Sequence, residues 1–100
     1  SYLDQFDADD VLLSALAKGA IGDSFAQIGQ MEDAFDYYVQ AAGVNENLFS
    51  TQKYLFKAAT LGAILGKEQV ALGYLKRIKE EFPDSREARL VDVQIGKLDN

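Results

Sequence analysis

The sequence predicts an all-α protein, and three observations support that prediction. Alanine and leucine, both strong helix formers, are its most frequent residues, whereas β-branched residues are few. Apolar residues recur every three or four positions through most of the 100 residues, which is the period of one helix face. Proline occurs once, and glycine directly follows three of the periodic segments, where helices commonly end. This length suits one domain or a few stacked helical units.

The chain opens with a short helical pattern and then a run of acidic residues. Residues 1–6 have helical apolar spacing and predict the end of a helix whose beginning lies outside this sequence. The aspartates within 7–10 are expected to stop that helix and to cap the next one, because a carboxylate accepts hydrogen bonds from free backbone N–H groups. The next helix is predicted over about 10–28, ending at Gly29.

A second helix over about 31–42 is predicted to fold back on the first. Its apolar stripe includes Ala34, and its expected C-cap is Gly43. Gly22 and Ala34 are small residues at the place where the two helix backbones are expected to approach closely. A polar linker follows, in which Phe49 falls at or near an exposed position; burial under the linker or under a missing repeat is the alternative.

Two further helices form the next predicted pair. They span about 51–65 and 68–81, with Gly66 between them. Pro83 then prevents the fourth helix from continuing.

The last helix is predicted over about 85–98. Asp84 followed by Glu87 resembles a capping box at its start. Its single narrow apolar stripe indicates a terminal helix that covers an exposed core.

The side-chain chemistry narrows the classes of function. The chain has no histidine and no cysteine, which removes the commonest general base and all thiolate sites, so no catalytic residue, metal site or cofactor is expected. Its carboxylates are interpreted as helix caps and solvated helix faces. A net charge of −6 disfavours nucleic acid as a partner.

An internal repeat is visible when the chain is shifted by 37 residues. Gly29 then falls on Gly66, and Ala34 falls on Ala71. The shared spacing of glycine, alanine and a large residue resembles the tetratricopeptide repeat (TPR) family. In the first copy the matching residues are Lys18, Ile21, Gly22, Phe25, Ala34, Tyr38 and Ala41. In the second copy they are Leu55, Ala58, Ala59, Gly62, Ala71, Leu75 and Pro83.

The chain departs from the family pattern in both copies. The first copy lacks the opening aromatic residue and has Glu46 where proline would stand. In the second copy Gly62 replaces an aromatic residue, and the linker carries a three-residue extension.

The resemblance implies a right-handed α–α superhelix of TPR helical hairpins, with about five helices and an N-terminal helix remnant. It divides the chain into the end of a preceding repeat with its linker (1–8), a first repeat (9–48), a second repeat (49–83) and a C-terminal capping helix (84–100).

The phrase EEFPDSREA is similar to repeat junctions in bacterial envelope TPR proteins, both the TolA-binding-like group and membrane-anchored periplasmic proteins. This similarity implies a periplasmic or cell-envelope location, with an anchor in a segment outside this fragment. A cytoplasmic location is the alternative.

The family likeness also implies a concave groove, lined by the first helix of each hairpin, that binds a peptide. The matching positions are Leu16, Gly19, Asp23, Ala26 and Gln27 in the first hairpin, and Lys53, Phe56, Lys57, Thr60 and Ile64 in the second. Asp23, Gln27, Lys53, Phe56, Lys57 and Thr60 are the candidate partner-binding residues. Lys53 and Lys57 lie one helical turn apart and could meet a carboxylate. An ordinary solvated helix surface is the alternative reading.

The expected function is a non-catalytic protein–protein interaction module that binds a protein or peptide through this groove. A structural or self-association spacer in an envelope complex is the alternative, with a homo-oligomer as a possible partner arrangement. An α-helical enzyme is a remote third. The sequence does not identify the partner.

Overall fold

The computed structural model describes residues 2–44 and 50–99, and among these the side chains of 12–44 and 50–96. The described residues contain five α-helices and no strand. Their bounds are α1, Tyr2–Gln27; α2, Met31–Gly43; α3, Thr51–Ile64; α4, Glu68–Glu81; and α5, Arg86–Asp99. The prediction of an all-α fold is confirmed. The predictions for the linker over 45–49, including the exposure of Phe49, concern residues outside the described part of the chain.

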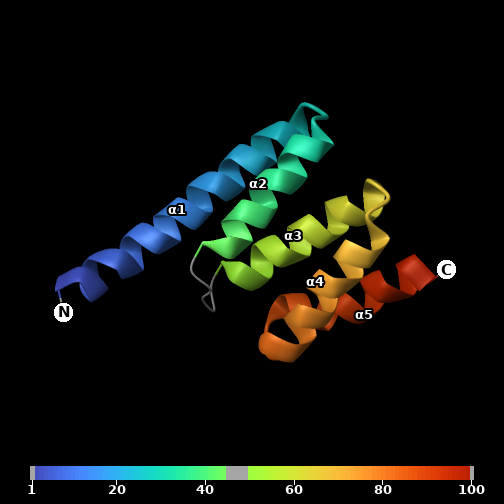
Figure 1. Cartoon of the computed structure of the whole chain (residues 1–100). Helices are drawn as coiled ribbons and strands as arrows, with labels where there is room; N and C mark the ends of the chain where they lie inside the picture. Colours follow the sequence, from blue (N-terminus) through green and yellow to red (C-terminus); the bar gives the residue numbers. More distant parts are fainter. Residues whose placement is uncertain (1, 45–49, 100) are drawn as a thin grey trace.

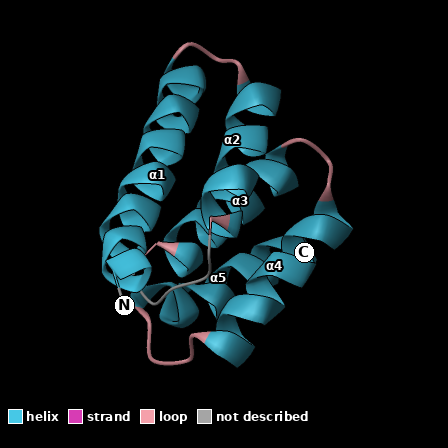
Figure 2. Ribbon diagram, turned by 60° about the vertical axis from the view of Figure 1, so that its left-hand side comes forward, coloured by secondary structure: helices cyan, strands magenta, loops and turns pink. Residues whose placement is uncertain are grey.

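The helices follow one another across the molecule in chain order (Figure 1). Each packs against the next, and α5 also packs against α3. The result is elongated and rather flat, with extents of 50 × 32 × 18 Å. α1 and α2 lie side by side and are joined by a short loop (Figure 2). Among the described residues, no helix is both long enough and apolar enough to cross a membrane.

The two hairpin bends share one local geometry. Gly29 and Gly66 have φ of +81° and +82°, the left-handed conformation that glycine adopts without a steric penalty. At the first bend the Gln30 N–H donates to the Phe25 carbonyl oxygen at 2.8 Å, and at the second the Lys67 N–H donates to the Gly62 oxygen at 2.7 Å. These bonds close the end of the preceding helix in the Schellman pattern. The predicted role of glycine at both bends is confirmed.

Alanines and a few large side chains form the core between the helices. The buried members include Leu75, Ile78 and Val91, which have no exposed surface, and two tyrosines, Tyr38 and Tyr54. The tyrosine rings stack with their centroids 6.2 Å apart and join α2 to α3. The predicted apolar stripe of α2 is confirmed, since its buried residues are Ala34, Phe35, Tyr38, Ala41 and Ala42.

Two glycines of α1 have no side chain and so leave space for these tyrosine rings. A Cβ placed on Gly19 would lie 2.2 Å from the Tyr54 ring. A Cβ placed on Gly22 would lie 2.8 Å from the Tyr38 ring and 3.3 Å from the Ala34 carbonyl oxygen. The predicted close approach at Gly22 and Ala34 is therefore confirmed. Gly19, predicted to line the groove, instead receives a buried ring.

Several predicted boundaries are wrong. α1 is one helix from Tyr2, with no break over 7–10, because aspartates cost a helix less than about 1 kcal/mol each and the segment contains no glycine or proline. Gly43 is the last residue of α2 rather than a left-handed cap. The capping side chain at α5 is Ser85, not Asp84: its Oγ accepts from the Ala88 N–H at 3.0 Å and donates to the Phe82 oxygen at 2.7 Å.

Candidate partner-binding groove

A hollow of about 350 Å³ lies where α1, α2 and α3 meet, and we call it the α1–α3 hollow. It is lined by Ala26, Tyr38, Phe56, Lys57, Thr60 and Leu61. Its lining is mostly apolar. The Thr60 hydroxyl donates to the Phe56 carbonyl oxygen of its own helix at 3.0 Å, so its hydrogen is already used. The hollow suits an apolar side chain better than a polar one.

A second hollow, of about 330 Å³, is formed by side chains of α3 and α5, and we call it the α3–α5 hollow. It is lined by Lys53, Phe56, Lys57, Arg86, Glu87 and Leu90. Phe56 and Lys57 border both hollows. α3 therefore forms the wall that the two hollows share, and four of the six candidate residues line one hollow or both.

Asp23 and Lys57 do not stand free in this groove, because they bind each other. The Lys57 Nζ lies 2.8 Å from the Asp23 carboxylate, and their side chains are 37% and 45% exposed. The Tyr38 hydroxyl donates to the same carboxylate oxygen. The Lys57 Nζ also lies 5.4 Å from the centre of the Tyr38 ring. This cluster ties α1, α2 and α3 together at the edge of the α1–α3 hollow.

The cluster shifts the pKa of both acidic groups. Burial opposes ionisation of Asp23, but the hydrogen bonds from Lys57 and Tyr38 outweigh it and hold the pKa of this carboxyl below its ordinary value. Burial and the hydrogen bond to Asp23 raise the pKa of the Tyr38 hydroxyl well above its usual range. Tyr38 thus stays a neutral donor, and Asp23 stays a charged acceptor, throughout the neutral range.

Lys53 remains available to solvent. It is exposed, and its Nζ lies 5.4 Å from the centre of the Tyr54 ring. Within the described part of the chain it makes no ion pair. The sequence predicts that Lys53 and Lys57 both face a ligand carboxylate. In the structure Lys57 is ion-paired with Asp23, and of the two lysines only Lys53 has no ion-pair partner among the described residues.

Five of the predicted groove positions line neither hollow: Gly19 and Asp23, described above, and Leu16, Gln27 and Ile64. Gln27 is exposed near the end of α1, Leu16 is 40% exposed on that helix, and Ile64 is 66% exposed at the end of α3. Ala26, in contrast, lines the α1–α3 hollow as expected from its position.

Sequence reasoning missed Arg86, Glu87 and Leu90, which α5 contributes to the α3–α5 hollow. They were assigned to a helix that merely covers the core. The order of the helices could have indicated this contact. A helix that follows two stacked hairpins is expected to pack beside the first helix of the second hairpin, which here is α3. Tyr38 and Leu61 are buried core residues, yet both also line the α1–α3 hollow.

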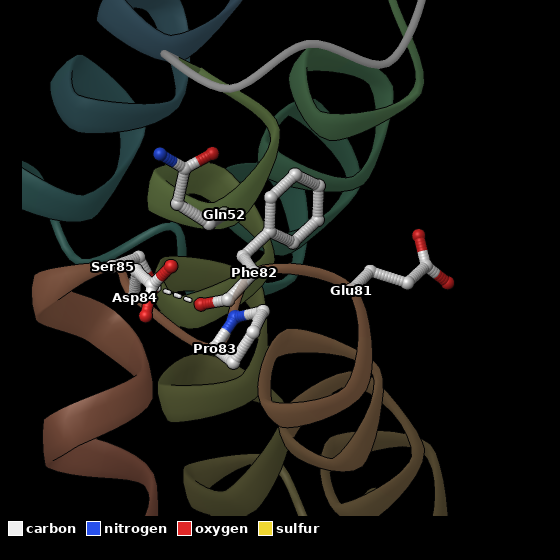
Figure 3. Close-up of a pocket in the computed structure, with 6 residues that line it drawn as sticks. All are labelled: Gln52, Glu81, Phe82, Pro83, Asp84 and Ser85. Carbon is white, nitrogen blue, oxygen red and sulfur yellow. Dashed lines mark hydrogen bonds between the residues drawn. The ribbon is translucent and has the colours of Figure 1, made fainter.

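A further hollow of about 310 Å³ lies at the corner between α4 and α5 (Figure 3). Gln52, from α3, and residues 81–85 line it. The Ser85 hydroxyl is bonded to the Phe82 carbonyl oxygen within the turn, as the dashed line shows. The polar groups of this turn thus serve to begin α5. Among the described residues, no cluster of three or more potential metal ligands occurs.

The α1–α3 and α3–α5 hollows therefore make up the candidate groove, with Phe56 at its centre. Comparisons of this chain with protein-family models, with curated proteins and with solved structures find no match.

Proposed function

We propose that this protein is a non-catalytic interaction module that holds a protein or peptide partner in the groove along α3. The observation that carries the proposal is the apolar α1–α3 hollow beside Phe56, open at the surface and bordered by the cation of Lys57. Peptide-binding sites of this kind combine an apolar anchor pocket with a few polar groups at the rim. The repeated hairpin geometry and the resemblance to TPR proteins support the same proposal.

The ion pair determines how the proposal is tested. Replacing Lys57 with glutamate would set two carboxylates against each other at Asp23, and any lost binding would then report a damaged fold. Thr60→Arg is a better choice, because it fills the α1–α3 hollow and preserves the cluster. Ile64→Arg is its matched control, since it adds the same side chain to the same helix outside both hollows.

The experiment is a phage-displayed peptide selection on the intact chain, followed by affinity measurements on the selected peptides. Peptides should bind the unmodified chain and Ile64→Arg equally and bind Thr60→Arg at least about tenfold more weakly. Phe56→Ala should weaken binding as well, with circular dichroism used to check that it remains folded. Undiminished binding to Thr60→Arg would place the peptide site elsewhere and defeat the proposal.

Self-association is a second candidate function, favoured by the outer face of α1. Leu13 and Ile21 of α1 are 63% and 42% exposed, and Ile28, which directly follows α1, is 70% exposed. The two charged residues between Leu13 and Ile28 each pair with another helix: the Lys18 Nζ donates to the Gln40 side chain at 3.4 Å, and Asp23 binds Lys57. Uncharged apolar faces of this extent commonly mark contact surfaces.

A second copy of the chain fits this face. If two copies of α1 lie antiparallel, Leu13 of each falls opposite Ile28 of the other, because the two residues are equidistant from the middle of the face. The small residues Ala17 and Ser24 also fall opposite each other, which permits close approach. The Ser24 hydroxyl is already bonded to the Ala20 oxygen at 3.1 Å, so its burial leaves no donor unsatisfied.

Sedimentation over a range of protein concentrations tests this candidate. The unmodified chain should show a mass that rises with concentration, and Ile21→Glu should stay monomeric. Val93→Glu, which alters an apolar residue of similar exposure on α5, should behave as the unmodified chain. A monomeric mass for the unmodified chain at the highest concentration would exclude the α1 interface.

A further inference from the structure

We infer that the α3–α5 hollow binds the side-chain carboxylate of a glutamate or aspartate in the partner segment whose apolar side chain occupies the α1–α3 hollow. The inference rests on the proposed function and specifies the partner's chemistry: an extended segment with an apolar residue and, a few positions along, an acidic one. It also gives α5 a role in recognition beyond covering the core.

The charges around the α3–α5 hollow favour an anionic ligand. Lys53 and Arg86 both line it, and neither makes an ion pair with another described residue. Lys57 is occupied by Asp23, so the positive charge offered to a ligand comes from the other two. Glu87 is the one carboxylate among the lining residues. In a chain of net charge −6, this is a local excess of positive charge suited to a single anion.

The apolar part of the same hollow indicates a side chain rather than a free ion. Phe56 lies on one side, and Leu90, which is 39% exposed, comes from α5. An acidic side chain would lay its methylene groups against these two residues and its carboxylate against the cations. Contacts with the apolar surface exclude some water, and a charge-assisted hydrogen bond is stronger where water is excluded.

The two hollows are adjacent, so one extended segment can occupy both. Because Phe56 and Lys57 border both, a segment leaving the apolar hollow passes directly over the shared wall into the cationic one. An extended chain advances roughly 3.3 Å per residue and returns to the same face at every second residue. An apolar residue and an acidic residue about two to four positions apart therefore match the groove.

Nucleic acid is a poorer occupant of these cations. Its affinity depends on neutralising many phosphates, whereas this groove offers two unpaired cations on an acidic chain. The C-terminal carboxylate of a peptide is chemically closer to the proposed ligand, and the experiment separates it from a side-chain carboxylate.

The test is a nuclear magnetic resonance titration of the ¹⁵N-labelled intact chain with synthetic peptides. The first peptide is a capped glycine–serine decamer with one leucine and one glutamate two residues later. The second has glutamine in place of the glutamate. The third has glutamine and an uncapped C-terminal carboxylate. The glutamate peptide should shift amide signals along both hollows and bind about three- to tenfold more tightly than the capped glutamine peptide.

Variants of the protein then locate the preference. The double variant Lys53→Gln, Arg86→Gln should bind the glutamate and glutamine peptides equally. Lys79→Gln is the matched control, since it removes a cation of α4 that is paired with Asp92 at 2.8 Å and lies outside both hollows. This control should retain the preference for glutamate. Added salt should reduce the preference in the unmodified chain.

The outcomes separate the inference from the proposed function. Equal binding of the glutamate and capped glutamine peptides, with shifts still confined to the α1–α3 hollow, overturns the carboxylate site and leaves the groove function intact. Tighter binding of the uncapped peptide than of the glutamate peptide overturns the assignment to a side chain. Absence of shifts in both hollows with every peptide at millimolar concentration counts against both proposals.

Discussion

Gly19 provides the sharpest test of how the helices fit together. A methyl group at this position would lie 2.2 Å from two ring carbons of Tyr54 and 2.3 Å from its hydroxyl oxygen. Ordinary carbon contacts lie at about 3.5 to 4.0 Å, so the ring must move by more than 1 Å. Tyr54 is 2% exposed and stacked on Tyr38, which leaves the ring little room to turn.

The magnitude follows from two opposing effects. Overpacking of a well-filled core costs typically about 1–3 kcal/mol, and this overlap belongs at the upper end of that range. Alanine is the better helix former by about 1 kcal/mol. Gly19→Ala should therefore lower the free energy of unfolding by about 1–2 kcal/mol. For a domain of this size, that corresponds to a fall in Tm of roughly 4–16 °C.

Urea unfolding monitored by far-ultraviolet circular dichroism measures the effect. Gly73→Ala is the control: Gly73 lies within α4, and a Cβ there meets nothing within 4 Å. This control should gain about 0.5–1 kcal/mol from helix propensity alone. The two alanine substitutions thus move stability in opposite directions, although they have the same chemistry.

A second background identifies the cause. In a Tyr54→Leu chain the ring is gone, so adding Gly19→Ala should no longer destabilise and should behave like Gly73→Ala. If Gly19→Ala stabilises the unmodified chain as much as Gly73→Ala does, the close contact between Gly19 and the Tyr54 ring is refuted. A loss that persists unchanged in the Tyr54→Leu background would refute it as well.

Three further predictions concern a turn, a cap and the ionic cluster. Gly66→Ala, at φ +82°, should cost about 1 kcal/mol in the free energy of unfolding, measured against Gly73→Ala. Ser85→Ala should also cost about 1 kcal/mol through loss of the cap, whereas Ser24→Ala, whose hydroxyl bonds within its own exposed helix, should be nearly neutral in the same urea assay. Asp23→Asn should cost less than about 1 kcal/mol at pH 7, because the ion pair is partly exposed. Since the folded pKa of Asp23 is lowered, its stabilisation is present above about pH 4, and the difference between Asp23→Asn and the unmodified chain should vanish as pH falls through the folded pKa; a difference that stays constant from pH 7 to pH 2 would contradict this.

The helix pattern was largely predictable because its signals are local. The start of α4 and the ends of α1 and α3 follow from glycines that take a left-handed conformation at Gly29 and Gly66. The start of α5 was harder, because an aspartate and a serine stand side by side and either can cap a helix. The break predicted over 7–10 failed for a related reason: residues that can cap a helix are also tolerated within one.

The site was predictable only in part, because its composition depends on contacts between helices. Phe56 and Thr60 were found from their register on one helix face. The pairing of Asp23 with Lys57 was not, since it joins residues of α1 and α3 that are 34 positions apart. Arg86 was missed because its place beside α3 depends on how the last helix packs.

The neighbour-by-neighbour packing of the helices has a consequence for how the chain folds. Apart from the contact of α5 with α3, the principal contacts join helices that are consecutive in the chain. Contacts of this kind close short loops, so the entropic barrier to folding is small and folding should be fast. Formation of one hairpin provides a surface on which the next can assemble.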